Sequence, residues 1–393
     1  MSLRNGPLLV PIPGPSIVPE RVRLAMDRAM PNIYAGELVD VSAEVLAELP
    51  SIARTSGHAF CTIGNGHSAW QMAICNTLSR GEKVLVLDCG RFAAIWGYLA
   101  EASGVEVEVL DSEAGRGVDP AAVTERLSAD AQHKIKAILM VHADTASSAV
   151  NDLPAIRRAI DDAGHPTLLM VDCIASLGCM PYEMDEWGID LTVGASQKGL
   201  MVPPGLGFVW AGQRAVDAYE TAGLRVGYFD WTARMADGPV YSKYGGTPPV
   251  SHLFGMQESL RMIAEEGIEN VWSRHAVLAG TVHAAVATWS TPGGIDFYVT
   301  EPSERAHSVT TVLTNNIDAD ELRHRCEHGA GVVLGVGIGD RASHSFRIGH
   351  MGHTNPPVVL GALATIEAAL KSMDAPLGGS GVASAAEAIA QHL

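Results

Sequence analysis

The chain has 393 residues, of which 47% are hydrophobic and 18% are charged, a composition that excludes an intrinsically disordered protein. Acidic residues outnumber basic ones by 44 to 27, giving a net charge of −17, which argues against a partner rich in phosphate, such as nucleic acid or an anionic membrane. The six cysteines form no CxxC pair, which is typical of free thiols in a reducing compartment. The first 20 residues lack the apolar core of a signal peptide, and no apolar run reaches the roughly 20 residues needed to span a bilayer. We therefore expect a soluble protein of the cytoplasm.

Short apolar runs alternate with longer helical patterns through the first two-thirds of the chain. Most runs are apolar throughout, which is typical of central strands covered by helices on both faces. The predicted strands are Phe60–Ile63, Lys83–Leu87, Val105–Leu110, Ala137–Val141, Leu168–Asp172, Leu191–Gly194 and Gly207–Trp210. This alternation predicts an α/β fold with a mostly parallel, doubly wound sheet.

The pattern changes after Trp210. Residues 223–249 are rich in aromatics, glycine and proline, which indicates an ordered connection that carries function. A helical pattern then runs from Ser251 to Glu266 and restarts at Ile268. The remainder predicts a smaller α+β domain, with strands near Val309–Leu313, Val332–Leu334 and His344–Ile348 and a short terminal helix after the glycines of 377–381.

Two charged residues follow predicted strands at the edge where open α/β sheets place their ligands. Lys198 lies in Gly194-Ala-Ser-Gln-Lys-Gly199, and partial desolvation there would lower its pKa and free the amine for a Schiff base. Asp172 ends a strand, where a carboxylate could pair with a cationic ring nitrogen. Taken alone, each also fits a structural role, as a solvated loop lysine and as a helix N-cap.

A glycine turn, Gly64-Asn-Gly-His-Ser-Ala69, follows the first predicted strand and opens a helix. Glycines let the backbone approach an anion, and free N–H groups at a helix start can hold a phosphate. The same spacing fits a dinucleotide fingerprint with Asp88 about 20 residues later. The turn therefore supports two cofactors, and an ordinary tight turn remains a third possibility.

Two further motifs lie in the second half of the chain. Arg347, on a short apolar strand, could form a bidentate clamp on a carboxylate or a structural ion pair. His324-Arg-Cys-Glu-His328 matches an inverted zinc-peptidase motif, but it lies in the charged stretch 318–328, which predicts an exposed helix without a third ligand. We therefore expect no metal site.

The chain resembles the class V aminotransferases of fold type I, which use pyridoxal 5′-phosphate. The resemblance rests on five features in the same order along the sequence: the glycine turn, an aromatic residue at Phe92, Asp172, Lys198 and Arg347. The resemblance runs from Pro13-Gly-Pro-Ser16 to the strand of Arg347 and is strongest to the serine–glyoxylate and alanine–glyoxylate branch. Three segments carry that closer likeness: Met184–Asp190, Ser196–Gly199 and Thr247–Val250.

The resemblance implies a large domain, residues 21–265, built on a mostly parallel seven-stranded sheet, and a small C-terminal domain, residues 266–393. Residues 1–20 would lie at the active site and the subunit interface. Tyr244 and Thr247 match a pair that the family donates from the neighbouring subunit, which implies a homodimer, or a tetramer made of two such dimers.

The resemblance also implies the site. Lys198 would form the Schiff base and move the substrate proton, and Asp172 would keep the cofactor's ring nitrogen protonated. The remaining cofactor contacts would be Gly66, His67, Ser68 and Gln197 at the phosphate, Phe92 and Ile174 on the two faces of the ring, Tyr244 and Thr247 from the partner, and Thr145 near both cofactor and substrate. Arg347 would bind the carboxylate of the amino donor and then of the oxo acid, with the backbone of Gly14 closing the pocket.

The implied activity is ping-pong transamination between serine or alanine and glyoxylate or pyruvate. The chain departs from the family at Asn65, at His142–Ser148 and at Gly245-Gly246, which leaves the amino donor open. A pyridoxamine–pyruvate aminotransferase, which shares Arg347–Gly352, is one alternative. Two others are an NAD-dependent dehydrogenase using Gly64–Ala69 and a binding protein that has lost turnover.

Overall fold

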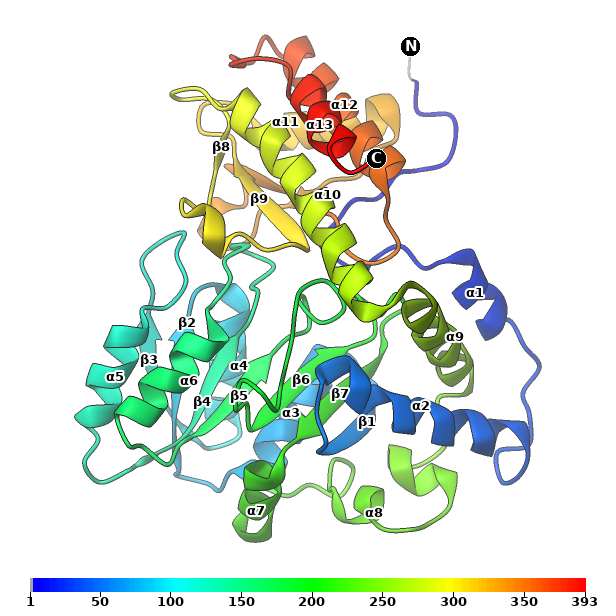
Figure 1. Ribbon diagram of the computed structural model, residues 1–393, viewed down its shortest axis with the longest axis vertical. Coiled ribbons are helices and arrows are strands. Elements are labelled where there is room, and N and C mark those ends of the chain that lie inside the picture. Colours follow the sequence, from blue (N-terminus) through cyan, green and yellow to red (C-terminus); the bar gives the residue numbers. More distant parts are fainter. Residues whose placement is uncertain (1–2) are drawn as a thin grey trace.

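The computed structural model describes residues 3–393 and contains two β-sheets, each covered by helices (Figure 1). The larger sheet has the strand order β1-β7-β6-β5-β4-β2-β3. Its strands are β1 (His58–Gly64), β2 (Lys83–Asp88), β3 (Glu106–Asp111), β4 (Ile135–Val141), β5 (Leu168–Asp172), β6 (Leu191–Ala195) and β7 (Gly205–Ala211). Strands β2 to β6 pair in parallel, whereas β7 runs antiparallel to both β6 and β1. The predicted seven-stranded, mostly parallel sheet is confirmed.

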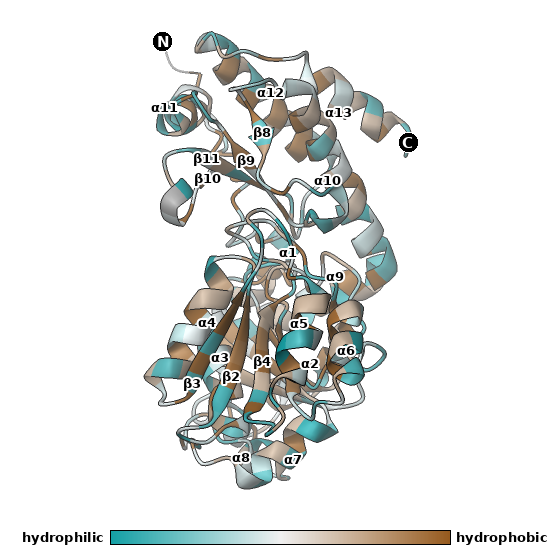
Figure 2. Cartoon of the chain, turned by 90° about the vertical axis from the view of Figure 1, so that its left-hand side faces the viewer, coloured by the Kyte–Doolittle hydropathy of each residue, from teal (hydrophilic) through white to brown (hydrophobic). Residues whose placement is uncertain are grey.

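Helices cover both faces of this sheet and bury two separate apolar clusters. One face is covered by α3 (Gly66–Thr77), α4 (Arg91–Ala102) and α7 (Gln213–Thr221), and the other by α2 (Glu37–Ala53), α5 (Pro120–Ser128), α6 (Leu153–Asp162) and α9 (Val250–Glu266). Figure 2 shows the central strands as brown along most of their length, as strands buried on both faces require.

The smaller sheet has the order β10-β11-β9-β8 and is antiparallel throughout. Its strands are β8 (Asp296–Phe297), β9 (Val309–Leu313), β10 (Gly335–Val336) and β11 (Ser345–Gly349). The long helix α10 (Ile268–Trp289) joins α9 to this unit, where α12 (Pro356–Ser372) and α13 (Gly381–Ala390) pack against it. The division of the chain at residues 265 and 266 stays a prediction.

The remaining elements are short. They are α1 (Glu20–Met26), α8 (Thr232–Met235) and α11 (Ala319–His324), the 3₁₀ turns Val240–Tyr244, Pro302–Glu304 and Gly339–Arg341, and a π-helical turn at Arg325–Gly329. The predicted connection 223–249 is thus ordered, and it contains α8 and the 3₁₀ turn Val240–Tyr244. None of the helices in residues 3–393 is long and apolar enough to cross a bilayer.

Two details of the small unit differ from the prediction. The apolar run Val332–Leu334 does not form the predicted strand, because Val332 instead pairs with Leu9 of the N-terminal segment and the ladder with β11 begins at Gly335. The α-helix expected over 318–328 ends at His324 and widens into the π-helical turn Arg325–Gly329. It is also not fully exposed, since Leu322 and Cys326 are buried.

The dehydrogenase alternative is wrong on topology. A dinucleotide fingerprint needs a strand–helix–strand unit whose two strands are parallel neighbours. Here β1 is an edge strand whose neighbour is the antiparallel β7, and β2, which ends in Asp88, lies beyond four intervening strands. Asp88 instead accepts a hydrogen bond from Gly90 N at 2.8 Å.

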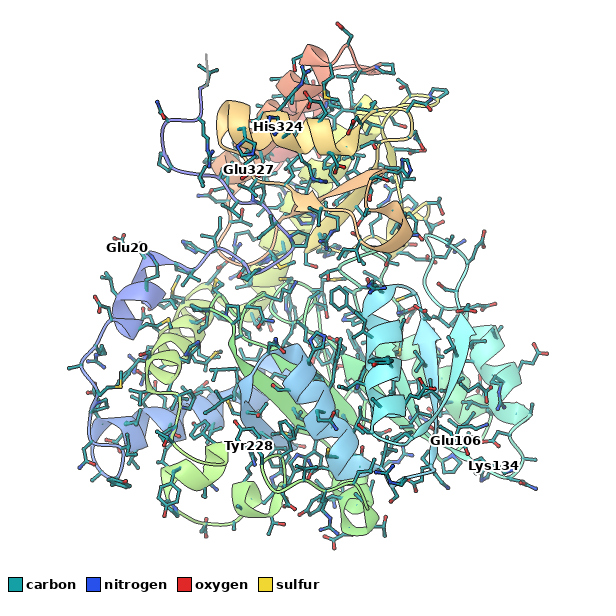
Figure 3. All side chains as sticks on the ribbon, turned by 180° about the vertical axis from the view of Figure 1, so that it is seen from behind. Glu20, Glu106, Lys134, Tyr228, His324 and Glu327 are labelled. Carbon is teal, nitrogen blue, oxygen red and sulfur yellow. The ribbon has the colours of Figure 1, made fainter. Side chains whose placement is uncertain are left out.

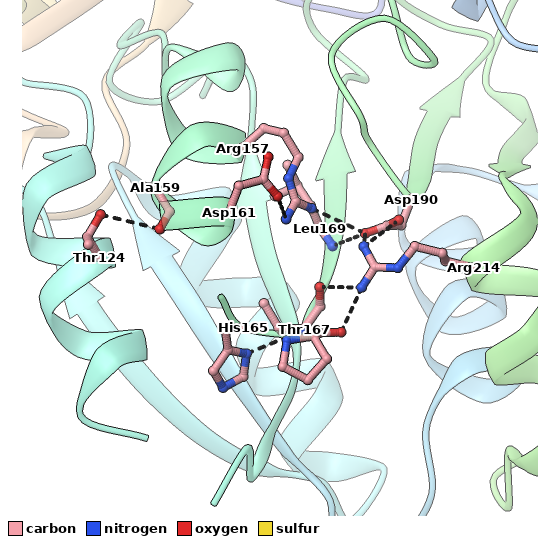
Figure 4. Close-up of polar contacts among 10 residues, drawn as sticks. Thr124, Arg157, Ala159, Asp161, His165, Thr167, Leu169, Asp190 and Arg214 are labelled. Carbon is pink, nitrogen blue, oxygen red and sulfur yellow. Dashed lines mark hydrogen bonds and ion pairs between the residues drawn. The ribbon is translucent and has the colours of Figure 1, made fainter. Parts of the chain in front are cut away.

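A polar network fixes the amino-terminal ends of β5 and β6 (Figure 4). The carboxylate of Asp190 accepts hydrogen bonds from Leu169 N at 2.7 Å and from the guanidinium of Arg214 at 2.9 Å. Arg214 also donates to Pro166 O at 2.7 Å. Because this network lies at the opposite end of β5 from Asp172, it anchors that strand without touching the candidate site.

Candidate active site

One cavity, of about 240 Å³, lies at the carboxyl ends of β4, β5 and β6, next to the first turns of α3 and α4. Most of the residues predicted from the sequence line it. They are Gly14, Gly66, His67, Phe92, Thr145, Asp172, Ile174, Gln197 and Lys198. The cavity therefore brings together residues that span nearly half of the sequence, from Gly14 to Lys198.

Asp172 is the last residue of β5 and is 3% exposed. Its Oδ1 accepts a hydrogen bond from Ile174 N at 2.7 Å, and its Oδ2 accepts one from Trp70 Nε1 at 2.9 Å. Burial raises the pKa of this carboxyl to about 7, against the opposing effect of those two donors. A cation placed beside Asp172 would stabilise its charged form, so the site is suited to a protonated ring nitrogen.

Lys198 follows β6 and faces the same cavity. Burial, and then the charge of Arg347, lower the pKa of its amine to about 8, while Asp172 opposes the shift. Its Nζ donates a hydrogen bond to Pro13 O. A lysine with this pKa has a usable fraction of free amine near neutral pH, as a Schiff-base lysine requires.

The N-terminal segment closes the cavity over Lys198. Ser16 holds it there, since its Oγ donates to Lys198 O at 2.7 Å and its N–H donates to Gln197 O at 2.9 Å. At Gly14, φ is +109° and a Cβ would lie 2.4 Å from Lys198 Nζ. Any other residue would be strained at this φ, and its side chain would displace the Lys198 amine.

The first turn of α3 forms the opposite end of the cavity. Asn65 caps the helix by accepting a hydrogen bond from His67 N at 3.0 Å, so the asparagine that departs from the family still makes the turn. A Cβ on Gly66 would lie 2.3 Å from Ile174 Cδ1, so this glycine lets Ile174 reach the cavity wall. Ser68 is not part of the lining, because its hydroxyl donates to Asn65 O at 2.7 Å.

Arg347 lies behind the lining on β11 and is 8% exposed. Its Nη1 donates to Thr145 O at 2.6 Å and its Nε donates to Val336 O at 2.7 Å. Burial lowers its pKa to about 10, and the nearby charge of Asp144 opposes that shift. Arg347 therefore contacts the backbone of a cavity residue, beside the space that a substrate would enter.

Tyr244 and Thr247 lie apart from the cavity of their own chain. Tyr244 is fully buried, and its hydroxyl is 2.7 Å from Ser42 Oγ on α2. In this position the phenol is not presented to a neighbouring subunit, whereas Thr247 is exposed at the surface. A role at a partner's site stays a prediction, and only Thr247 is placed where it could serve without rearrangement.

Two residues at the site were missed from the sequence. Trp70, one helical turn after Gly66, lines the cavity and donates to Asp172. Asp144, noted only as part of a departure from the family, is fully buried, and its Oδ2 accepts from Phe92 N at 2.8 Å. Spacing along α3 could have identified Trp70, because residues four apart share a helix face.

The residues present fit pyridoxal 5′-phosphate. An amine and a buried acid face one cavity, and the positive end of α3 lies there to receive a phosphate. The side-chain oxygen of Gln197 is buried and has no hydrogen-bond partner among residues 3–393, so this amide is held ready for a polar ligand. Phe92 and Ile174 supply the apolar walls for a ring.

The zinc-peptidase motif lies elsewhere, at the outer side of the small unit (Figure 3). The rings of His324 and His328 are 4.6 Å apart, centroid to centroid. Within residues 3–393, no group of three or more His, Cys, Asp or Glu side chains is arranged to hold a metal ion.

Comparison with known proteins agrees with this geometry. The family model for aminotransferase class V matches residues 54–348. The chain is 36% identical over 390 residues to a serine–glyoxylate aminotransferase of Methylorubrum extorquens, covering 97% of this chain and 96% of that protein. It is also 36% identical over 383 residues to an L-aspartate–glyoxylate aminotransferase of Paracoccus denitrificans, covering 96% and 94%.

Among solved structures, the pyridoxamine–pyruvate aminotransferase of Mesorhizobium loti superposes with a TM-score of 0.88 at 25% identity, covering 98% of both chains. The family model, the relatives of similar length and the superposed fold all agree, and the cavity contains both Lys198 and Asp172. This chain therefore belongs to the class V aminotransferases, and it is a pyridoxal 5′-phosphate-dependent enzyme of fold type I.

Proposed function

We propose that the enzyme transfers an amino group from a small amino acid, serine or alanine, to glyoxylate or pyruvate by a ping-pong mechanism. The observation that carries this proposal is the charge of the cavity wall. Within the described residues 3–393, Lys198 is the only lysine or arginine that lines the cavity, and Arg347 lies just behind Thr145. One arginine serves an amino acid and an oxo acid that each carry a single carboxylate, whereas a dicarboxylic donor needs a second cation.

The walls around that charge are small. Gly14, Ala143 and Ala175 line the cavity, leaving room but few polar partners for a substrate side chain. The two relatives with equal identity are named for different donors, serine and L-aspartate, but for the same acceptor, glyoxylate. Glyoxylate as acceptor therefore has support from both, and the cavity favours the smaller donor.

Pyridoxal 5′-phosphate supplies an aldehyde that condenses with amines and a ring that draws electrons away from the substrate Cα. Lys198 Nζ would hold the aldehyde before substrate enters, and would then remove the proton from Cα of the donor. In the second half-reaction, Nζ would return a proton to Cα of the former oxo acid. Its pKa of about 8 suits transfer in both directions near neutral pH.

The other residues would bind and orient. Asp172 would hold a proton at the ring nitrogen, with its carboxylate fixed by Trp70 and Ile174. Phe92 and Ile174 would exclude water from the two faces of the ring. The first turn of α3, at Gly66 and His67, together with Gln197 would bind the phosphate, and Thr145 would contact both cofactor and substrate.

Arg347→Ala tests the proposed substrate site. The KM for donor and for acceptor should rise together, by an amount that corresponds to about 2–4 kcal/mol for a lost charge-assisted pair. Half-reactions with individual amino acids, followed by the visible absorption of the bound cofactor, identify the donor. If only dicarboxylic or large amino acids react, the proposed donor class is wrong. If both KM values are unchanged, Arg347 is not the carboxylate site.

A second candidate is a pyridoxamine–pyruvate aminotransferase. It is favoured by the superposition on that enzyme from Mesorhizobium loti and by the resemblance of Arg347–Gly352 to that branch. The glycine turn and helix start at residues 64–66, which suit a phosphorylated cofactor, favour the first proposal. Incubation with pyridoxamine and pyruvate distinguishes them, since only the second candidate forms free pyridoxal and alanine.

We also infer a homodimer in the cytoplasm. Three tyrosines are exposed at the surface, Tyr34 by 76%, Tyr241 by 43% and Tyr228 by 40%, and the hydroxyl of Tyr228 lies 3.5 Å from Ile63 O, next to the glycine turn. Tyr34 and Tyr241 already contact each other edge to face, with centroids 6.5 Å apart. A partner covering this patch would bring Thr247 to a neighbouring site. All six cysteines are buried free thiols, which suits a reducing compartment.

A further inference from the structure

The loop of residues 142–150, which follows β4, contains a serine in an unusual conformation. Ser148 has φ +69°, in the left-handed region that favours glycine. It is 3% exposed, and its Oγ lies 2.6 Å from Thr311 Oγ1 on β9 of the small sheet. A serine side chain is thus kept at a position where glycine would be less strained, and its hydroxyl reaches across to the other structural unit.

The hydrogen bonds of this pair have a fixed direction. Thr311 Oγ1 donates to Ala146 O at 3.1 Å. A threonine hydroxyl has one proton, so Thr311 must accept, and Ser148 must donate, in the bond between the two hydroxyls. The result is a continuous chain from Ser148 through Thr311 to the backbone carbonyl of Ala146.

This chain lies directly beside Arg347. In the pairing of β9 with β11, Thr311 is the register partner of Arg347. Arg347 Nη1 donates to Thr145 O at 2.6 Å, so the carbonyls of two successive loop residues are held by side chains from adjacent strands. Thr145 lines the cavity, and therefore the loop and the guanidinium are positioned as one assembly.

We propose that Ser148 and Thr311 are positioning residues that set the substrate-binding geometry of Arg347 and Thr145, and so the affinity for the carboxylate of both substrates. This inference rests on the proposed role of Arg347. Without the pair, β9 loses its side-chain link to the loop, and the Arg347 guanidinium keeps only its own contacts to Thr145 O and Val336 O. Small displacements at such a site reduce productive binding.

Ser148→Gly and Thr311→Val test the pair in the full-length enzyme loaded with cofactor. In S148G the KM for amino donor and for oxo acid should each rise about tenfold, with kcat changed less than about threefold. Its melting temperature should be no lower than that of the parent, because glycine relieves the left-handed strain. T311V should raise both KM values similarly, and T311S, which keeps the hydroxyl, should restore them.

Thr281→Val is the matched control. Thr281 is fully buried in α10, and its hydroxyl donates only within that helix, to Val277 O at 2.8 Å. It should lower the melting temperature without raising either KM. Because S148G relieves strain, it keeps the test decisive if T311V folds poorly.

Parental KM values for both substrates in S148G would overturn the inference, as would a rise for one substrate only. If R347A raises both KM values while S148G and T311V leave them unchanged, the positioning role fails and the proposed function stands. If R347A itself leaves them unchanged, the proposed carboxylate site fails first.

Discussion

Replacing Trp70 by phenylalanine removes one of the two N–H donors that stabilise the Asp172 carboxylate, while keeping an aromatic ring on α3. The bond lost runs from Trp70 Nε1 to Asp172 Oδ2 at 2.9 Å, in a fully buried setting. A hydrogen bond to a charged group is worth about 1.5–3 kcal/mol. Since one pKa unit corresponds to about 1.36 kcal/mol, the pKa of Asp172 should rise by about 1–2 units above its present value of about 7.

The consequence is a shift in the pH dependence of cofactor binding. Asp172 holds a protonated ring nitrogen only as the carboxylate, so affinity falls as pH drops through the pKa of Asp172. In W70F that fall should begin about 1–2 units higher. The dissociation constant of pyridoxamine 5′-phosphate, measured by calorimetry from pH 5.5 to 9, isolates this effect because that ligand needs no bond to Lys198.

Trp96→Phe is the control for loss of an indole. Trp96 is also fully buried, stacks on Trp70 with centroids 5.9 Å apart, and has no hydrogen-bond partner for Nε1 among the residues described. Its pH profile should match that of the parent. Equal shifts in W70F and W96F, or no shift in W70F, would refute the role given to the Trp70 hydrogen bond.

Two further predictions concern the closing turn and acid stability. Gly14→Ala should weaken cofactor binding at least about tenfold, with an unchanged circular dichroism spectrum, because the new methyl group meets Lys198 Nζ. The control is Gly164→Ala, at φ +60° with open space around it, which should leave cofactor binding unchanged. Burial lowers the pKa of His283 to about 3, so below pH 6.5 the unfolded chain binds a proton that the folded chain does not, and stability falls as pH decreases. At pH 5 this costs about 2 kcal/mol relative to neutral pH, and urea unfolding of H283Q should show a correspondingly smaller loss.

Much of the fold could be predicted because most buried strands of the large sheet are nearly continuous apolar runs. The position of strand β10 could not be predicted, because the apolar run Val332–Leu334 that suggested a strand lies just before it. That run pairs instead with the N-terminal segment, where Val333 N donates to Leu9 O at 2.8 Å. A pairing between residues so far apart in the sequence leaves no local pattern.

The same distinction holds at the site. Asp172 and Lys198 stand at strand ends, and parallel strands bring their carboxyl ends together, so a shared cavity could be predicted from position alone. The bond from Trp70 to Asp172 joins residues 102 positions apart, and the bond between Ser148 and Thr311 joins residues 163 apart. Such partners are set by packing between elements, and the burial of Tyr244 against Ser42 is likewise visible only in the folded chain.

The chemistry proposed for this enzyme depends on the Lys198 amine holding the coenzyme. Reducing the purified enzyme, loaded with pyridoxal 5′-phosphate, with borohydride and mapping the modified peptide by mass spectrometry tests it directly. The label should lie on Lys198 alone, and Lys198→Ala should abolish both the label and the visible absorption band. A stoichiometric label on any of the other lysines, Lys83, Lys134, Lys136, Lys243 or Lys371, with Lys198 unmodified, would contradict the account.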